Sequence, residues 1–120
     1  MTILELNHVA LFVRDVVRSC EFYAIVLRLE SLPRPAFDFP GAWFRLGQSQ
    51  ELHLIGGSNE AAVSSVRGNH FALRVEDVAD WERHVQSSGA LVRGPVKRPD
   101  GATQLFLRDP DGHLIELFQF

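Results

Sequence analysis

Residues 6–16 read LNHVALFVRDV, and residues 68–78 read GNHFALRVEDV. Seven of the eleven positions are identical, which is far more than chance gives in a chain of 120 residues. The stretches that follow also correspond, since ELHLI at 51–55 aligns with LIELF at 114–118 and places His53 over Glu116. We therefore expect one domain, residues 1–120, made of two copies of one unit at about 4–57 and 67–120. A linker rich in Gly, Ser and Ala joins them at about 58–66.

Each copy is expected to form a strand, a helix and three further strands. In the first, a strand over 6–14 precedes Asp15 as a helix N-cap, and short strands follow near 30–38, 43–46 and 51–55. In the second, a strand over 68–76 precedes Asp77 as an N-cap, and strands follow at 91–97, 103–108 and 113–120. The turn signal DPDG at 109–112 separates the last two. This order predicts an α+β fold of two βαβββ units with eight strands in an open mixed sheet.

The composition excludes several classes of protein. Twelve Lys and Arg against 15 Asp and Glu give a net charge of −3, without the basic surface that nucleic acids require. No apolar run reaches the length of about 18 residues that a membrane span needs. The single cysteine excludes an internal disulfide framework, and residues 1–15 lack the features of a signal peptide. We therefore expect a cytoplasmic protein that binds neither nucleic acid nor a membrane.

Four strands are each expected to carry one possible metal ligand among apolar neighbours. Because strand side chains alternate between two faces, one face of each strand is wholly apolar and suits packing beneath a helix. The opposite faces carry the four candidate ligands His8, His53, His70 and Glu116. If the two copies pack about a pseudo-two-fold axis, these groups can meet at one divalent metal ion, which would be Zn, Ni, Mn, Fe or Co.

The alternative is that these four side chains are not metal ligands. A single histidine on a strand is more often a hydrogen-bonded core or surface residue. Their equivalent positions in the two copies favour a shared site. His84, in the middle of a helix, and His113, beside a turn, are expected to play no part in it. Glu51 lies on the same strand face as His53 and is the main competitor: it could replace His53 as a ligand or join it.

These segments resemble the vicinal oxygen chelate superfamily, which groups glyoxalase I, methylmalonyl-CoA epimerase, extradiol dioxygenases, and fosfomycin- and bleomycin-resistance proteins. The resemblance is carried by NHVALFV at 7–13 with Asp15, FY at 22–23, HFALRV at 70–75 and DPDGHLIEL at 109–117. It implies a glyoxalase-like fold whose eight strands form an open, U-shaped sheet around a divalent metal. It also implies His8, His70 and Glu116 as ligands, with His53 at the fourth-strand position that glyoxalases and epimerases use.

Three positions depart from the family pattern. Arg28 stands where a glycine usually follows the first helix, so the end of that helix is expected to differ. Ala10 replaces the threonine that fosfomycin-resistance enzymes use two residues beyond the first histidine. His53 replaces the glutamate that glyoxalase I usually has, which counts against proton transfer by a pair of glutamates.

The leading functional hypothesis is a metal-dependent lyase or isomerase of the glyoxalase type, acting on a small molecule that chelates the metal through adjacent oxygens. Glu116 is the expected catalytic residue, as the proton acceptor, unless a water on the ion takes that role. The alternatives are an extradiol-type dioxygenase, a transferase that adds a thiol or water to an antibiotic-like epoxide, and a metal-free resistance protein that sequesters an antibiotic-like ligand.

The sequence gives fewer indications of which residues bind the substrate. Arginines can bind a carboxylate or phosphate, and aromatic side chains can line a pocket; the candidates are Arg74, Arg45, Arg108, Phe12, Phe106 and Phe118. The aromatic segment 37–44 could form a pocket wall or lid, fill the core, or contact a second copy. The exposed edges of an open sheet favour a homodimer, and the metal site could lie within one chain or between two.

Overall fold

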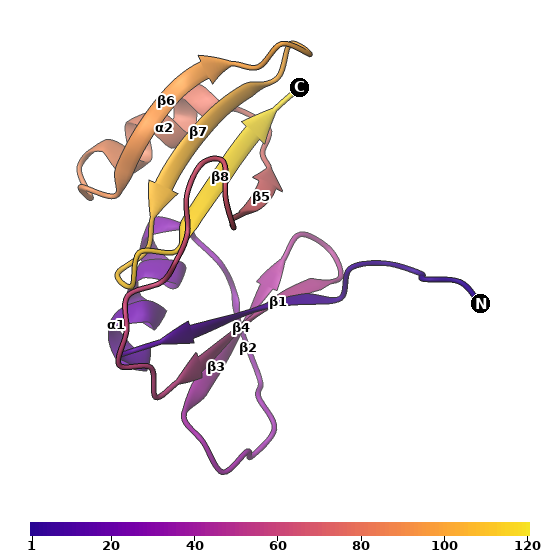
Figure 1. Ribbon diagram of the computed structural model, residues 1–120, viewed down its shortest axis with the longest axis vertical. Helices are drawn as coiled ribbons and strands as arrows, with labels where there is room; N and C mark the ends of the chain where they lie inside the picture. Colours follow the sequence, from indigo (N-terminus) through magenta and orange to yellow (C-terminus); the bar gives the residue numbers. More distant parts are fainter. The chain divides into compact units, whose positions relative to one another are not determined.

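The computed structural model describes all 120 residues, and the chain divides into two compact units, Met1–Glu60 and Ala61–Phe120. Each unit contains one helical segment and four strands, in the order strand, helix, strand, strand, strand (Figure 1). The predicted α+β fold of two βαβββ units is therefore confirmed. None of the helices combines the length and the apolar character that crossing a membrane would require.

The first unit consists of β1 (His8–Val13), α1 (Val16–Glu21), the π-helical turn η1 (Phe22–Val26), β2 (Ser31–Leu32), β3 (Gly41–Leu46) and β4 (Gln50–Gly56). The second unit consists of β5 (Phe71–Arg74), α2 (Val78–Gln86), β6 (Leu91–Lys97), β7 (Thr103–Arg108) and β8 (Leu114–Gln119). Residues 1–7 precede β1 without regular structure and are exposed (Figure 1).

The strands form one mixed, four-stranded sheet in each unit, with the orders β1-β4-β3-β2 and β5-β8-β7-β6. In both sheets the first and last strands of the unit pair in parallel, and the other neighbours pair antiparallel. A parallel pair needs a long connection between its strands, which the helix and the two intervening strands supply. The two orders are equivalent, as a duplicated unit requires.

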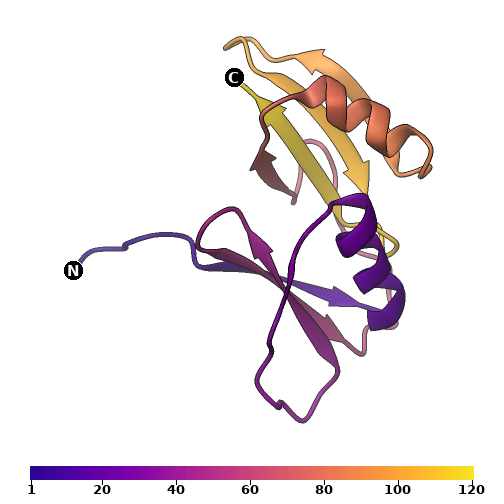
Figure 2. The same ribbon diagram turned by 180° about the vertical axis from the view of Figure 1, so that it is seen from behind.

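Both helices begin where the sequence predicts. The side chain of Asp15 accepts a hydrogen bond from the backbone N–H of Arg18, and that of Asp77 accepts from Ala79 and Asp80. These bonds satisfy N–H groups that the first turn of a helix leaves without partners. In the second unit, α2 then lies across the sheet formed by β6, β7 and β8 (Figure 2).

The end of the first helix departs from regular geometry, as the arginine at position 28 predicts. The α-helix passes into η1, and the backbone N–H of Leu27 bonds the carbonyl of Phe22 five residues earlier. Arg28 then adopts a φ of 55°, in the left-handed region that favours glycine. The helical segment therefore ends here through a conformation that is strained for arginine.

The core of the first unit lies on one face of its sheet. In the second unit, β7 and β8 bury side chains on both faces, with Leu105 and Leu107 on one and Phe106 on the other. In β4, Leu52 and Leu54 are 0 % and 1 % exposed, whereas Glu51, His53 and Ile55 are partly exposed. The predicted division of each strand into an apolar face and a face with polar groups holds in this strand. The buried side chains of the two units are those of Leu11, Val13, Phe22, Tyr23, Leu27, Phe44, Leu46, Leu52 and Leu54, and of Val78, Val85, Ala102, Leu105, Phe106, Leu107, Leu114, Ile115 and Leu117.

Two predicted strands are shorter than expected. The stretch near 30–38 pairs only at Ser31–Leu32, at the edge of its sheet, since Pro33 and Pro35 follow and cannot donate to a ladder. The strand expected over 68–76 pairs only over Phe71–Arg74. His70 therefore lies immediately before β5 rather than within it.

Candidate functional site

His8 and His53 lie next to each other on one face of the first sheet. Because β1 and β4 pair in parallel with Ala10 opposite His53 and His8 opposite Glu51, alternation places the side chains of these residues on the same face. The two imidazole rings are stacked, with centroids 4.2 Å apart and planes 20° from parallel. The first unit thus brings together two of the four predicted metal ligands.

Two other side chains hold His53 in place. Oε1 of Glu51 lies 2.8 Å from Nε2 of His53, and because a carboxylate only accepts, the imidazole is the donor. Trp43 stands opposite His53 in the ladder of β3 and β4. Its rings stack on the imidazole at 4.0 Å, with an angle of 5° between the planes. Glu51, the predicted competitor for the ligand position, is thus in direct contact with His53.

The two histidines related by the repeat are oriented in the same way. Nδ1 of His8 lies 2.8 Å from the side-chain oxygen of Asn7. Nδ1 of His70 lies 3.2 Å from the carbonyl oxygens of both Ser65 and Gly68. An imidazole that donates from Nδ1 to an oxygen keeps the lone pair on Nε2, and histidines that bind metals are commonly held by such a bond. Both histidines therefore present Nε2 as a possible metal donor.

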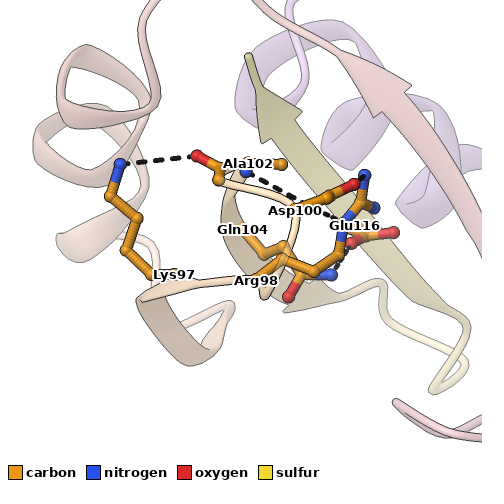
Figure 3. Close-up of polar contacts among 7 residues, drawn as sticks. Lys97, Arg98, Asp100, Ala102, Gln104 and Glu116 are labelled. Atoms are coloured by element: carbon orange, nitrogen blue, oxygen red, sulfur yellow. Dashed lines mark hydrogen bonds and ion pairs between the residues drawn. The ribbon is translucent and has the colours of Figure 1, made fainter.

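Glu116 is a buried carboxylate, 4 % exposed, on β8. Its Oε2 lies 3.6 Å from Nε2 of His70, and its Oε1 accepts a hydrogen bond from the side-chain amide of Gln104 on β7 (Figure 3). A buried carboxylate is costly unless polar partners compensate it. Gln104 and His70 supply those partners, so the second unit brings together the other two predicted ligands.

The chemistry of these donors fits a divalent metal. Three imidazoles and a carboxylate are ligands that Zn²⁺, Fe²⁺, Mn²⁺, Co²⁺ and Ni²⁺ accept. Each unit holds two of the four donors, and the structure contains no assembled group of three or more His, Cys, Asp or Glu side chains that could hold a metal ion. One unit alone therefore does not form the predicted centre.

Three of the predicted substrate-binding residues share the face of the second sheet that carries Glu116. Phe106 stands opposite Glu116 in the ladder of β7 and β8, and Arg74 stands opposite Phe118 in that of β5 and β8. Because Glu116 and Phe118 are two residues apart, all four side chains lie on one face. The ring of Phe106 also makes an edge-on contact with that of His70, with centroids 6.2 Å apart.

The other two predicted arginines already have partners. The guanidinium of Arg45 donates to the carboxylate of Glu30 at 3.0 Å. That of Arg108 donates to the carbonyls of Ser64 and Gly112, at 3.1 Å and 2.7 Å, and so ties the β7–β8 turn to the segment before β5. A substrate anion would have to displace these contacts.

The remaining aromatic candidates lie in the first unit. Phe12 on β1 shares the face of His8 and is 55 % exposed. In the aromatic segment, Phe44 is buried in the core, whereas Phe37 and Phe39 are 47 % and 40 % exposed. The last two rings stack on each other, with centroids 5.2 Å apart. Only Phe44 therefore fills the core, and Phe37 and Phe39 are exposed.

The histidines expected to lie outside the site have other contacts. The ring of His84 makes an edge-on contact with Trp81 on the same helix, at 5.7 Å. The backbone N–H of His113 donates to the side chain of Asp109 at 2.8 Å, and the N–H of Gly112 donates to the carbonyl of Asp109 at 3.1 Å. These bonds confirm the predicted turn at 109–112.

Sequence analysis missed Gln104 and Arg98. Gln104 could have been found, because it shares its strand face with Phe106. Arg98 follows β6 in a loop, where no periodic signal operates; it donates from two nitrogens to Asp100, at 2.8 Å and 2.7 Å (Figure 3). The hydrogen bonds to Asp100 raise the pKa of Arg98, and the negative charge of Glu116 acts in the same direction. The same pairing lowers the pKa of Asp100. Arg98 therefore adds positive charge close to Glu116.

Comparison with known proteins gives a consistent result. The pattern of the Glyoxalase/Bleomycin resistance protein/Dioxygenase superfamily matches residues 5–117. A lactoylglutathione lyase of Salmonella typhimurium is 35 % identical, over 97 % of this chain and 93 % of its own. Glyoxylase I 4 of Arabidopsis thaliana is 31 % identical, over 94 % of this chain and 69 % of its own.

Solved structures agree with these relatives. A glyoxylase/bleomycin resistance protein/dioxygenase domain from Frankia sp. EAN1pec has 25 % sequence identity and a TM-score of 0.82, over 98 % of both chains. The matches in sequence and in structure extend over nearly the whole chain. The chain therefore belongs to the Glyoxalase/Bleomycin resistance protein/Dioxygenase superfamily, the vicinal oxygen chelate proteins.

Proposed function

We propose that this protein is a metal-dependent enzyme of the glyoxalase type, a lyase or isomerase that acts on a small molecule with adjacent oxygens. Two lines of support meet in this proposal. The relatives include proteins named lactoylglutathione lyase, at 35 % identity in one case. The donor pairs of the two units have the ligand chemistry of a divalent metal site.

One divalent ion would be held by His8 and His53 from the first unit and by His70 and Glu116 from the second. The observation that carries this proposal is the matched orientation of His8 and His70, whose Nδ1 atoms both bind oxygens and whose Nε2 atoms remain available. Equivalent positions in a duplicated unit would then serve one centre. The two units could come from one chain or from two copies in a homodimer.

The ion would act as a Lewis acid toward two adjacent substrate oxygens and so favour negative charge on them. Glu116, loosened from the ion, would then be the group that accepts the substrate proton, because it is a carboxylate held beside His70 by the amide of Gln104. The buried setting of Glu116 excludes bulk water from this transfer. Arg74, Phe106 and Phe118 lie on the same face and would contact the substrate.

A second candidate is a metal-free protein that sequesters a small aromatic ligand. The exposed, stacked rings of Phe37 and Phe39 favour it, since exposed aromatic side chains are suited to bind a flat ligand. The buried Glu116 counts against it, because a sequestering surface for an apolar ligand has no need of a buried carboxylate beside an imidazole.

Metal content tests the proposal most directly. Protein purified without a polyhistidine tag and without chelator should contain about one transition metal per pair of units, measured by elemental analysis and native mass spectrometry. The variants His8→Ala and His70→Ala should each lose most of the bound metal. His84→Ala, a histidine on α2 outside the proposed set, is the matched control and should keep it. Protein that takes up no Zn²⁺, Mn²⁺, Fe²⁺, Co²⁺ or Ni²⁺ would contradict the proposal and favour sequestration.

Activity is then assayed on a substrate panel that begins with lactoylglutathione, the compound in the names of these relatives. Glu116→Gln keeps the size of the side chain but cannot accept the proton, so turnover should fall by at least about 100-fold. The far-ultraviolet circular dichroism should remain unchanged. Undiminished turnover in this variant would remove Glu116 from the catalytic role.

We also propose a cytoplasmic homodimer. The exposed edges of two four-stranded sheets favour association with a second copy. Sedimentation equilibrium should give twice the mass of 13.5 kDa, and a monomer at micromolar concentration would contradict the proposal.

A further inference from the structure

Three rings form a continuous stack on the open face of the first sheet. His53 lies between His8, with ring centroids 4.2 Å apart, and Trp43, with ring centroids 4.0 Å apart. The planes of Trp43 and His53 are 5° from parallel, and the side chain of His53 is 14 % exposed. The indole thus covers one face of the imidazole and His8 covers the other.

This stack is incompatible with one ion bound by both histidines. The lone pair of an imidazole nitrogen lies in the plane of the ring, so a bound ion lies in that plane, about 2.1 Å from the nitrogen. The ring planes of His8 and His53 are stacked and only 20° from parallel. Such planes do not meet within bonding distance of both rings. One ring must therefore turn before both histidines can bind the same metal.

The contacts of each ring indicate which one turns. His8 already presents Nε2, since its Nδ1 is bound to Asn7. His53 instead donates from Nε2 to Glu51, at 2.8 Å, and its ring is held flat against Trp43. Both contacts hold His53 in an orientation that directs Nε2 toward Glu51 rather than toward an ion shared with His8.

We infer that Trp43 is a positioning residue: it holds His53 in a stacked orientation, and this stack opens when the metal binds. The inference rests on the proposed function, because it requires His8 and His53 to share an ion. It assigns a role to Trp43 and makes the rotation of His53 part of metal binding. A contact that exists only without the metal lowers metal affinity, so removing the indole should tighten binding.

The fluorescence of Trp43 reports on the stack directly. Trp43 and Trp81 are the only tryptophans, so Trp81→Phe leaves Trp43 as the single reporter. Zn²⁺ added to this variant should change the Trp43 emission and saturate at the stoichiometry that native mass spectrometry gives. Trp43→Phe leaves only Trp81, which contacts His84 on α2, and is the matched control. Its emission should remain unchanged by Zn²⁺.

The affinity for zinc provides a second measurement. Trp43→Leu removes the aromatic stack but keeps an apolar side chain, and it should tighten Zn²⁺ binding about 2- to 10-fold, the range expected for the loss of one aromatic pair. Trp43→Phe keeps a smaller ring and should lie between Trp43→Leu and the natural protein. Trp81→Leu should leave the affinity unchanged. Circular dichroism of each variant establishes that it is folded.

The outcomes separate this inference from the proposed function. If Zn²⁺ binds and the Trp43 emission does not change, or if Trp43→Leu binds zinc more weakly, the inference is wrong while the metal site stands. If no metal binds to any variant, the proposed function fails and the inference fails with it. A change in Trp43 emission together with tighter binding by Trp43→Leu supports both.

Discussion

Arg28 is the one residue other than glycine with a positive φ, at 55°. A β-carbon in this left-handed conformation costs roughly 1–2 kcal/mol, whereas glycine adopts it freely. The first helix ends here through the π-helical turn η1, so the strain lies at a junction that the chain must pass to reach β2.

Replacing Arg28 with glycine should therefore stabilise the protein. The relief of strain exceeds the entropy that glycine adds to the unfolded chain, and the net gain should be about 1 kcal/mol. Urea unfolding followed by circular dichroism measures it. Arg18→Gly, in the regular part of α1, is the control and should instead destabilise by about 1 kcal/mol. A loss of stability in Arg28→Gly would show that the left-handed conformation carries no strain.

Cys20 should react slowly with thiol reagents. Burial raises the pKa of its thiol, because it disfavours the charged thiolate. At pH 8 less thiolate is present than in a free cysteine, so alkylation by iodoacetamide should be slower than for free cysteine and should accelerate as the pH rises toward the raised pKa. The same shift means that stability falls as the pH rises through the pKa of the unfolded thiol. A rate at pH 8 equal to that of free cysteine would contradict this expectation.

The candidate ligands could be predicted from the sequence because strand alternation and the internal repeat point to the same residues. His8 and His70 fall at the same position of a duplicated motif, and each unit indeed pairs one histidine with a second donor. The partner Trp43 could not be predicted in the same way. Trp43 stands opposite His53 in the ladder of β3 and β4, and the register of pairing is a tertiary property that a single strand does not encode.

At the scale of elements, β4 shows how one strand serves two purposes. Leu52 and Leu54 are buried, while Glu51 and His53 face the other side of the sheet. Leu54→Ala should destabilise the protein by about 2–5 kcal/mol through loss of burial and a residual cavity. Ile55→Ala, one residue further on the partly exposed face, should cost less than about 1.5 kcal/mol. Thermal and urea unfolding of the two variants provide the comparison, and equal losses would refute the assignment of faces.

Most elements follow from the sequence, and the exceptions have local causes. The strands β6 and β7 occupy the predicted residues, and both helix N-caps are where the aspartates predict them. The π-helical turn η1 is not predictable from apolar spacing, because α- and π-helical turns bury similar residues. The short pairing of β5 is not set by the length of its partner, because β8 extends one residue beyond each end of the register Phe71–Arg74 with Ile115–Phe118.

At the scale of the whole molecule, the proposed site links metal binding to stability. A metal that binds only the folded protein adds RT ln(1 + [metal]/Kd), about 2.7 kcal/mol at a hundredfold excess over Kd. Zn²⁺ should therefore raise the Tm of the natural protein by several degrees, and chelator should reverse the increase. His8→Ala and Glu116→Gln should lose most of this response, whereas His84→Ala should keep it. An equal increase in all variants would show that zinc binds elsewhere.

The separation of faces in β4 also bears on how such proteins diversify. Side chains buried in the core alternate along the strand with side chains whose replacement costs little stability. Related proteins can therefore exchange one ligand residue after another while the fold persists. Variation in reaction among related proteins is then the expected result of the two-residue periodicity of such a strand.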